Sequence, residues 1–402
     1  MTAFVPLLPA AALLAATATA TVLPPHSAAT AAETPVAPYV VVLKDSTSRA
    51  PTRALAAEAA DSGDAVGPVY EAALNGFAVR TTAARAAALA ADPRVASVEP
   101  DAEFRITDTR PQSQPRPQPQ PQVPAPWSLD RIDQRELPLD GSYTYPTTAE
   151  GVTVYIVDSG INTRHQEFAG RARHGYNAVF LGTSRDCNGH GTHVAATVGG
   201  ETYGVAKGVS LVAVKVADCR GAASLSAILK GLDWVVKDAA KAPGTPAVAN
   251  MSIGGTPSFA LDAAVIRAVA SGITFTVAAG NDGKDACTGS PASVPQAVTV
   301  GATDAADRHA PFSNHGRCVD LSAPGVGITS AWKDTTTATA TATGTSMAAP
   351  HVAGAAALIL ARGTARTPAQ VSEALLHSAV PDRITGLPSG TPNLLLQTPT
   401  HL

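Results

Sequence analysis

The sequence lacks an excess of charge of either sign. Among its 402 residues, Lys and Arg number 29 and Asp and Glu number 32, which gives a net charge of −3, and only 15% of the residues are charged. It has neither a basic stretch of the kind that binds nucleic-acid phosphates nor an acidic tail. We therefore expect no nucleic-acid partner.

Cysteine is scarce, and a common hydrolase motif is missing. The four cysteines are Cys187, Cys219, Cys287 and Cys318, and none of them forms the Cys-x-x-Cys spacing of a zinc site. Four cysteines allow three pairings, and an even count in an exported chain favours two disulfides. The Gly-x-Ser-x-Gly turn of lipases and esterases is incomplete in the run GTSMA, because Ala348 occupies its last position.

One long apolar run lies near the N-terminus, at residues 4–23. It is rich in alanine and threonine and contains Pro6 and Pro9, features that favour a secretory signal peptide over a membrane-spanning helix. No Lys or Arg precedes the run, which departs from the usual signal pattern. We assign residues 1–32 to the signal region and expect a secreted, extracellular protein without stable membrane association.

The next part of the chain, residues 39–106, has the pattern of a small α+β unit. Strands are expected at 39–44 and 74–80, helices at 50–61 and 82–92, and further strands within 95–106 on either side of Pro100. This is a βαββαβ-like order. The Pro- and Gln-rich residues 109–126 that follow favour an extended linker that a protease cuts easily.

From residue 127 onward, short β-branched strands alternate with helices. Strands are expected at 152–157, 211–216, 247–252, 273–278 and 297–300, and helices at 224–240 and 258–271. The strands lack polar alternation, which favours burial on both faces of a parallel sheet. We expect a three-layer α/β domain with a mainly parallel sheet and an active site at the carboxyl ends of its strands. The Thr/Ala stretch 335–343 is expected to form a surface hairpin.

Three segments place a carboxylate, an imidazole and a hydroxyl in the order Asp, His, Ser. Asp158 follows the strand 152–157, His190 begins a helical segment in DCNGHGTHVA, and Ser346 precedes helix formers in GTSMAAPHVAG. A serine needs a base to become a nucleophile, and a carboxylate behind the imidazole fixes its tautomer. Asn281, in AAGND, offers a side-chain donor for an oxyanion, and the Ser346 N–H would be the second donor.

Each of these residues also has a simpler interpretation. An Asp after a strand is often a turn former, Gly-Asn is common in turns, and a serine before a helix is a favoured cap. His190 and His193 lie one helical turn apart, but the HExxH spacing of a metal site is missing. An esterase would need Asp382 and His401 as partners of the serine. A third alternative is a protein that keeps the fold only for binding. The combination and order of the residues favour catalysis.

The chain resembles the subtilases, the subtilisin-like serine proteases, over residues 39–106 and 126–378. The run GTSMAAPHVAG and the chain order of the three catalytic candidates carry this resemblance, and that order is the order of subtilisin. LNGFAV and DPRVASVEPD resemble the inhibitor-like propeptide of the family. Three segments are similar to the proteinase K and aqualysin branch: APWSLDRIDQRELPL, RDCNGHGTHVAATVGG and SNHGRCVDLSAPG.

The resemblance implies a secreted serine endopeptidase that is made as a self-processed zymogen. It divides the chain into an inhibitor-like, ferredoxin-like propeptide at 33–108, the linker at 109–126 near the maturation site, and a subtilisin-like catalytic domain at 127–402. The propeptide would act as intramolecular chaperone and inhibitor, polypeptides would be the substrates, and the enzyme would be a monomer. The branch implies the pairings Cys187–Cys219 and Cys287–Cys318.

The resemblance also implies where substrates bind. Family members bind the substrate as an added strand between two enzyme segments, which match Gly221, Ala222 and Ala223, and Ser252, Ile253, Gly254 and Gly255. The side chain before the scissile bond would enter a pocket walled by residues 252–254 and by Ala278, Ala279 and Gly280. A small, neutral lining favours apolar or aromatic side chains. Gly289 stands where relatives often have an aromatic residue, so the preferred size stays open.

A structural calcium ion is a further implication of the resemblance. The carbonyls of Pro295 and Ala297, with the carboxylate of Asp320, match a family site built from hard oxygen ligands. Asp320 has an alternative interpretation as a solvated loop acid. No catalytic metal is expected.

Overall fold

The structure is a computed structural model, and it describes residues 35–44, 50–106, 109–112, 123–179 and 182–398. The predicted signal region, residues 1–32, lies outside the described residues. Val36–Leu402 form one compact unit.

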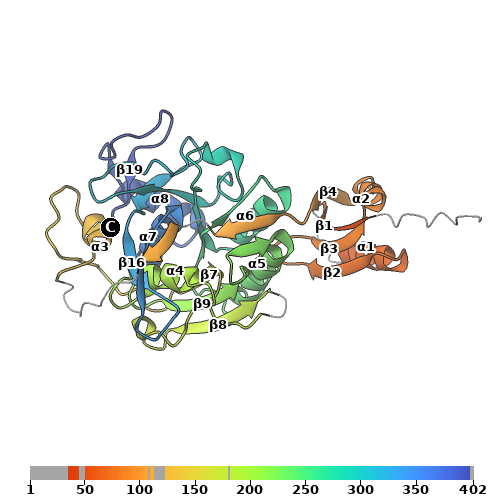
Figure 1. The fold of residues 1–402 in the computed structure, drawn as a ribbon, viewed down its shortest axis with the longest axis horizontal. Helices are drawn as coiled ribbons and strands as arrows, with labels where there is room; N and C mark the ends of the chain where they lie inside the picture. The colour runs from red at the N-terminus through yellow and green to blue at the C-terminus, as the bar shows by residue number, and fades with distance from the viewer. Residues whose placement is uncertain (1–34, 45–49, 107–108, 113–122, 180–181, 399–402) are drawn as a thin grey trace, which may run out of the picture. The chain divides into compact units, whose positions relative to one another are not determined.

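The first part of this unit is a small sheet covered by two helices (Figure 1). Its elements are β1 (Val36–Leu43), α1 (Ala50–Asp61), β2 (Ala65–Tyr70), β3 (Gly76–Thr82), α2 (Ala83–Ala90) and β4 (Val95–Pro100). The strands are antiparallel in the order β2-β3-β1-β4. Val41 and Phe77 from the sheet pack against Leu55 of α1 and Leu89 of α2. This is the expected ferredoxin-like βαββαβ arrangement.

One strand of this sheet has no counterpart among the predicted strands. β2 has the sequence AVGPVY, in which Gly67 and Pro68 weaken the strand pattern. Its register against β3 shifts between Val66 and Val69, at these two residues. Tertiary pairing with β3 overrides the weak local preference.

The expected strands on either side of Pro100 exist, but they belong to different sheets. β4 ends at Pro100, and β5 (Glu103–Ile106) leaves the first sheet. β5 forms an antiparallel three-stranded sheet with β10 (Ala222–Ser224) and β12 (Ile253–Gly254). The predicted strand after Pro100 therefore exists, but it pairs outside the small sheet, because sequence pattern does not reveal the partner of an edge strand.

The second part contains a nine-stranded sheet. Its order is β18 (Val380–Pro381), β19 (Leu394–Leu395), β15 (Leu321–Pro324), β14 (Val298–Thr303), β13 (Thr274–Ala278), β11 (Ala247–Met251), β7 (Thr153–Asp158), β9 (Ser210–Lys215) and β8 (Ala172–Asn177). All neighbours are parallel except β18 and β19. The five predicted strands correspond to β7, β9, β11, β13 and β14, and the mainly parallel sheet is confirmed.

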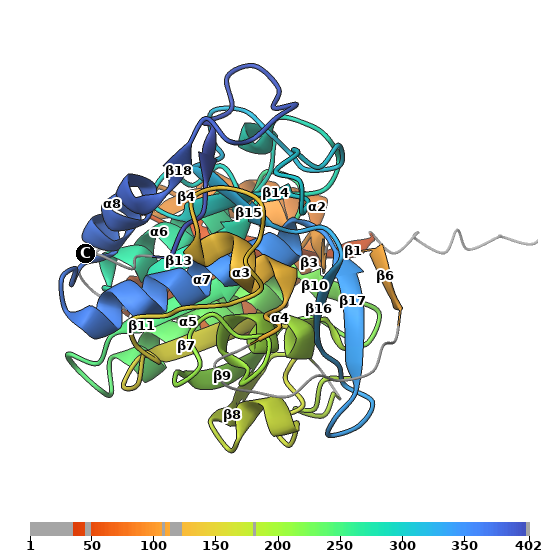
Figure 2. The same cartoon turned by 90° about the vertical axis from the view of Figure 1, so that its left-hand side faces the viewer.

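Helices cover both faces of this sheet, which makes three layers. Side chains of β7 alternate: Val154 and Ile156 join a cluster with α4 (His190–Gly199) and α7 (Thr345–Arg362). Tyr155 and Val157 join the cluster of α5 (Leu225–Ala239) and α6 (Phe259–Ala270) on the opposite face. Figure 2 shows α7 along one face of the sheet. Burial on both faces explains the continuous apolar strands.

Several shorter elements complete the described chain. They are α3 (Trp127–Asp133), α8 (Pro368–Ser378), the 3-10 turns η1 (Gln166–Phe168) and η2 (Ala286–Thr288), and the strands β6 (Thr109–Gln112), β16 (Ile328–Ala331) and β17 (Thr339–Thr343). β16 and β17 form an antiparallel hairpin, in which the Thr/Ala stretch supplies the second strand. The predicted surface position of this stretch is wrong for its strand, because Thr339, Ala340 and Ala342 are buried. β6 pairs with the outer edge of β17 (Figure 2).

Candidate active site

Asp158 and His190 meet at the carboxyl end of the central strand. Asp158 is the last residue of β7, and His190 is the first residue of α4. Both Asp158 carboxylate oxygens lie 2.8 Å from His190 Nδ1, and both side chains are completely buried. This contact favours the tautomer that carries the proton on Nδ1, which makes Nε2 the basic nitrogen of the ring.

A buried carboxylate that sequence reasoning missed holds these two elements together. Asp186 Oδ1 accepts hydrogen bonds from Ser159 Oγ at 2.9 Å and from Gly189 N at 2.8 Å. Its Oδ2 accepts from both the N–H and the hydroxyl of Thr192. Asp186 thus satisfies N–H groups at the start of α4 and ties them to the residue after Asp158. The motif Asp-x-Asn-Gly-His was the available signal.

Ser346 lies in the first turn of α7. The backbone N–H groups of a first helical turn point out of the N-terminal end of the helix and have no acceptor within it. The Ser346 hydroxyl donates to the carbonyl of Ser252 at 3.2 Å, and the Ser252 hydroxyl donates back to the Ser346 carbonyl at 3.0 Å. Asn250 extends this contact, because its Nδ2 donates to Ser252 Oγ and its Oδ1 accepts from the hydroxyl of Thr276. All four side chains are completely buried. This network fixes the nucleophile candidate relative to β11 and β13.

Asn281 is oriented by the residue that precedes Ser346. Its Oδ1 accepts from Thr345 N at 2.9 Å and from Thr345 Oγ1 at 2.8 Å. Because the carbonyl side of the amide is held in this way, its Nδ2 donor lies on the opposite side. Gly280 has a φ of +106°, and a Cβ there would lie 2.3 Å from Asn314 Nδ2. Asn314 Nδ2 also donates to the Ala279 carbonyl at 2.9 Å, so Asn314 supports this loop.

His193 has a structural role in this arrangement. Its Nε2 lies 3.0 Å from the carbonyl of Ile328, and burial lowers its pKa to about 3. The ring is therefore neutral at physiological pH and donates to that carbonyl. Across the residues that the structure describes, no three His, Cys, Asp or Glu side chains are grouped as metal ligands. The metal-pair alternative for His190 and His193 has no support in this geometry.

The two predicted substrate-binding segments flank a strand of the same chain. On one side, Ala222 pairs with Arg105 and Ala223 with Phe104, while the Ile106 N–H donates to the Gly221 carbonyl at 3.0 Å. On the other side, Ile253 pairs with Ile106 and Gly254 with Arg105. Residues 103–106 therefore occupy the place that the sequence predicts for a substrate strand.

Phe104 fills an apolar pocket between these segments. The side chain is completely buried in the cluster that contains Ala223 and Ile253. A Cβ built on Gly255 would lie 2.4 Å from Phe104 Cδ1, so the glycine is needed for this close packing. Sequence reasoning missed Phe104, because it identified the enzyme segments and not their occupant.

A cleft of about 520 Å³ adjoins the same strand. Its lining includes four of the six residues predicted to wall the substrate pocket, Gly254, Ala278, Ala279 and Gly280, together with Gly255 and Gly289. A Cβ on Gly289 would lie 3.0 Å from the Gly255 carbonyl oxygen. Asp282 and Lys284 also line the cleft, so charged side chains border a lining of small residues.

Comparison with known protein families agrees with this geometry. Residues 149–396, more than half of the chain, match the model of the subtilase family, and residues 38–107 match peptidase inhibitor I9. The chain belongs to the subtilase family. It is a serine endopeptidase with an inhibitor-type propeptide.

Curated relatives and a solved structure support the assignment. The extracellular serine proteinase of Thermus sp. strain Rt41A is 53% identical over 84% of this chain and 78% of its own length. The cuticle-degrading protease of Metarhizium anisopliae is 40% identical over 89% of this chain and 88% of its own length. The crystal structure of a cold-adapted subtilisin-like serine proteinase is 50% identical, with a TM-score of 0.65, and covers 69% of this chain and 99% of its own.

The propeptide of this subtilase docks through carboxylates placed at helix ends. Asp101 Oδ1 accepts from the Ser226 N–H at the start of α5, at 2.8 Å, and Glu99 Oε1 accepts from the Ala260 N–H at the start of α6, at 2.7 Å. Negative charge at a helix N-terminus is favourable. In the reverse direction, Asp233 of α5 accepts from backbone N–H groups of residues 71–73.

The residues predicted to hold calcium lie around the start of β14. Asp320 Oδ2 accepts from the Thr299 N–H at 2.7 Å, and Pro295 and Ala297 precede this strand directly. Burial raises the pKa of Asp320 to about 6. Among the described residues, no basic side chain forms an ion pair with it. A half-buried carboxylate without a positive partner suits a bound cation.

Two disulfides join the cysteines in sequential order. Cys187 pairs with Cys219 and Cys287 with Cys318. The first crosslinks the loop before His190 to the segment before β10, and the second crosslinks the loops beside Gly289 and Asp320. Both disulfides therefore brace loops at the site.

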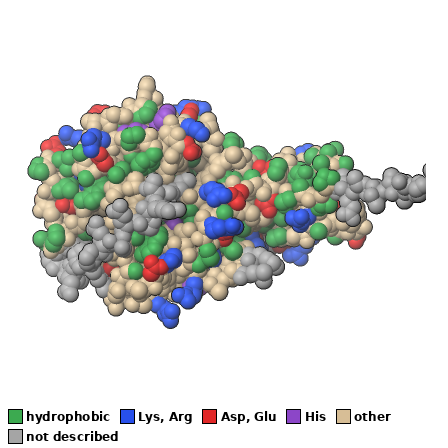
Figure 3. Space-filling model, viewed as in Figure 1, with side chains coloured by type: hydrophobic (Ala, Val, Ile, Leu, Met, Phe, Trp, Pro, Cys, Tyr) green, Lys and Arg blue, Asp and Glu red, His purple; other side chains and the backbone are tan. Residues whose placement is uncertain are grey.

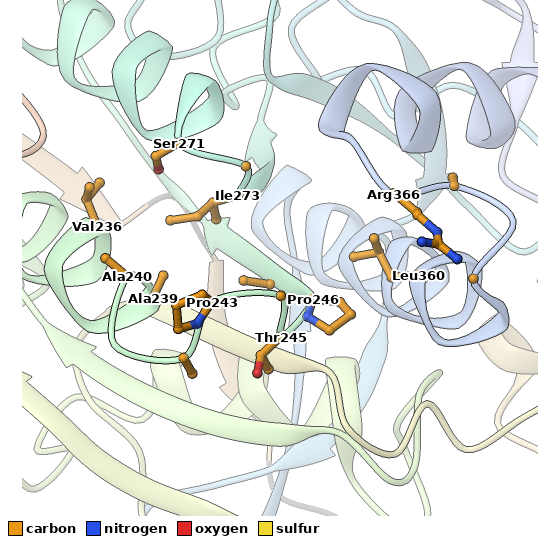
Figure 4. Close-up of a pocket in the computed structure, with 16 residues that line it drawn as sticks. Val236, Ala239, Ala240, Pro243, Thr245, Pro246, Ser271, Ile273, Leu360 and Arg366 are labelled. Atoms are coloured by element: carbon orange, nitrogen blue, oxygen red, sulfur yellow. The ribbon is translucent and has the colours of Figure 1, made fainter.

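A second, larger cleft lies at the other end of the sheet. It measures about 780 Å³ and is lined by short apolar side chains around Pro246 and Ala247, with the guanidinium of Arg366 at one side (Figure 4). Ala247 is the first residue of β11, so this cleft adjoins the amino ends of the strands. The three catalytic candidates lie at the carboxyl ends, and the larger cleft is not their site.

The distribution of charge on the surface agrees with the near-neutral net charge of the sequence. On the face shown in Figure 3, basic and acidic side chains are interspersed. Within the described residues, no helix combines the length and the apolar character needed to cross a membrane.

Proposed function

We propose that Asp158, His190 and Ser346 form the catalytic triad. His190 Nε2 takes the hydroxyl proton as Ser346 Oγ attacks the substrate carbonyl, and the same proton passes to the leaving amine when the peptide bond breaks. Water then enters and gives a proton to His190 as it attacks the acyl-enzyme. His190 returns this proton to Ser346 Oγ as the ester bond breaks, which releases the acid and restores the serine. Asp158 stabilises the imidazolium throughout.

We assign the oxyanion donors to Asn281 Nδ2 and the Ser346 N–H. The two hydrogen bonds from Thr345 to Asn281 Oδ1 support this assignment, because they orient the amide before any substrate arrives. Preorganised donors of this kind stabilise the charge that develops in the transition state.

The observation that best supports peptide hydrolysis is the way in which two strands of the same chain, β5 and β6, pair with segments near the proposed nucleophile. β5 is held between β10 and β12, and β6 is held by β17, whose last residue, Thr343, lies three residues before Ser346. Two strands from one short stretch of chain thus pair with segments on two sides of the proposed nucleophile. We propose that the maturation cut falls between Ile106 and Thr109, just before the linker.

We propose that extended polypeptides bind like β5. Main-chain pairing with β10 and β12 supplies affinity, and the pocket that holds Phe104 favours a large apolar side chain at the corresponding substrate position. The cleft at Gly289 would take the side chain before the scissile bond, with a broad preference for apolar or aromatic residues.

We further propose a structural calcium ion at Asp320, with the carbonyls of Pro295 and Ala297. A site with one carboxylate and backbone oxygens is compatible with the lack of a cluster of acidic ligands in the described residues. The ion would supply the positive partner that Asp320 lacks. We also propose that the enzyme is secreted after removal of residues 1–32 and acts as a monomer, in line with its extracellular relatives.

One labelling experiment separates this proposal from its alternatives. Treatment of the processed enzyme with a serine-directed sulfonyl fluoride should abolish peptide hydrolysis and leave a single adduct on Ser346, located by peptide mass mapping. Hydrolysis of a peptide and a fatty ester is measured in parallel. Lack of an adduct would favour a binding protein, and faster ester than peptide hydrolysis would favour an esterase.

A further inference from the structure

Lys215 is a buried lysine beside the proposed triad. It is the last residue of β9 and pairs in register with Asp158, the last residue of β7. Side chains alternate between the faces of a sheet, and Leu211 and Ala213 of β9 lie in the cluster on the α4 face. Lys215 therefore extends from the same face as Asp158, and it is only 1% exposed. On its other side, β8 presents the uncharged Asn177.

The ammonium group of Lys215 binds the residue that follows Asp158. Its Nζ donates to the Ser159 carbonyl at 2.5 Å and lies 3.6 Å from Cys187 Sγ, which belongs to a disulfide. The Ser159 N–H donates to Asp158 Oδ1 at 2.6 Å. Ser159 thus joins the ammonium group to the proposed catalytic carboxylate through two hydrogen bonds of its backbone.

Three carboxylates act on this ammonium group. Burial lowers the pKa of Lys215, and the negative charges of Asp186, Asp158 and Asp218 oppose this effect. Asp186 accepts hydrogen bonds from hydroxyl and N–H groups, which are neutral. Asp218 lies closer to the surface and pairs with Arg220 at 3.5 Å. Lys215 is therefore a buried cation that faces two buried carboxylates, Asp158 and Asp186.

A positive charge at this place acts on the proposed base. Asp158 lies 2.8 Å from His190 Nδ1, and a His190 ring that is protonated at low pH cannot accept the proton of the serine. Lys215 repels the protonated ring, whereas Asp158 and Asp186 attract it. The other histidine of α4, His193, adds no charge, because burial lowers its pKa to about 3.

We propose that Lys215 is a positioning residue of the triad, which holds the backbone that supports Asp158 and opposes protonation of His190 through its charge. This inference rests on the proposed triad. Its consequence is that the base stays free, and the enzyme active, at a lower pH than two buried carboxylates alone would allow. One charge on the order of 10 Å away, at an effective dielectric constant of about 20–40, accounts for about 0.5–1 pH unit.

Two substitutions separate the charge of Lys215 from its hydrogen bond. Lys215→Gln keeps a donor for the Ser159 carbonyl and removes the charge, whereas Lys215→Arg keeps the charge. Lys207→Met is the matched control, because Lys207 is also buried but lies beyond the far end of α4, where it donates to the carbonyls of Glu201 and Gly204. Thermal unfolding confirms that each processed enzyme is folded, and kcat/KM for an uncharged peptide anilide is measured from about pH 5 to pH 9.

Lys215→Gln should raise the midpoint of the acid limb of kcat/KM by about 0.5–1 pH unit. One pH unit below the wild-type midpoint, its activity should then be about three- to tenfold lower than that of the wild type. Lys215→Arg and Lys207→Met should keep the wild-type midpoint. An unmoved midpoint in Lys215→Gln, with or without a loss of kcat, overturns the inference, because a purely structural lysine predicts that result.

A measurement on the unaltered enzyme covers the case in which Lys215→Gln does not fold. Lysine labelled with carbon-13 at Cε distinguishes an ammonium group from a neutral amine by its NMR shift, and Lys207→Met tells the signals of the two buried lysines apart. Lys215 should remain an ammonium group throughout the acid limb, and a neutral amine there overturns the inference. A wild-type profile without an acid limb would instead contradict the assignment of His190 as the base.

Discussion

Replacement of Gly255 by alanine tests the pocket that holds Phe104. The added Cβ would lie 2.4 Å from Phe104 Cδ1 and 2.8 Å from Cε1, distances that no relaxed contact permits. Gly255 is held by paired hydrogen bonds with Ser290, 3.1 and 3.2 Å long, so the backbone cannot retreat easily. A substrate phenylalanine would therefore have to leave the pocket.

The size of the effect follows from the burial of this ring. Phe104 is completely buried, and burying a phenylalanine side chain contributes about 1.5–3 kcal/mol. At about 1.4 kcal/mol for each factor of ten, this corresponds to roughly a 10- to 150-fold preference for phenylalanine over alanine in kcat/KM. Gly255→Ala should reduce the preference to about threefold or less.

The assay compares a peptide that copies residues 101–112 with a version carrying alanine in place of Phe104. Gly254→Ala is the matched control, because the nearest atom to a Cβ there is the Ser290 carbonyl oxygen at 3.9 Å. This control should keep the phenylalanine preference. If Gly255→Ala also keeps it while hydrolysing the alanine peptide normally, the assignment of the pocket is wrong.

Three further changes test the donors, the ion and the crosslinks. Asn281→Ala should lower kcat about 10²–10³-fold with little change in KM, a range known from subtilisin; a loss confined to KM would contradict the donor role. With calcium chelated, the free energy of unfolding of the wild type should fall by up to about 3 kcal/mol as pH rises from about 4 to 6, because the pKa of Asp320 is raised in the folded protein. Asp320→Asn should remove both this pH dependence and stabilisation by calcium in thermal unfolding, and persistent calcium stabilisation would place the ion elsewhere. Replacing Cys287 and Cys318 by serine opens a loop with a sequence separation of 31 and should cost about 3–4 kcal/mol in denaturant unfolding, so an unchanged midpoint would argue against the crosslink.

The elements that sequence analysis predicted share strong local signals. The strands that became β7, β9, β11, β13 and β14 are continuous apolar runs, and the helix predicted at 224–240 matches α5 within a residue at each end. Each of the proposed catalytic residues lies beside such an element: Asp158, His190, Asn281 and Ser346. Predicting the position of the element therefore also predicted the position of the residue. The residues of one edge of a parallel sheet could thus be predicted to meet.

The features that escaped prediction depend on partners distant in sequence. β5 is an ordinary short strand, and only the three-dimensional arrangement reveals that it pairs with β10 and β12 instead of β4. Asp186 and Asn314 are polar loop residues, and their role follows from the backbone groups that surround them. Phe104 is one apolar residue among many until the pocket that receives it is known.

The most direct test of the catalytic account is where the chain cuts itself. Wild-type protein and Ser346→Ala are produced in parallel, and each is examined by N-terminal sequencing and intact mass. We expect the wild type to begin at residue 107, 108 or 109, and Ser346→Ala to keep the peptide bonds between Ile106 and Thr109 intact. Processing of the Ser346→Ala protein at the same bond, or a first wild-type cut outside Ile106–Thr109, would contradict the account.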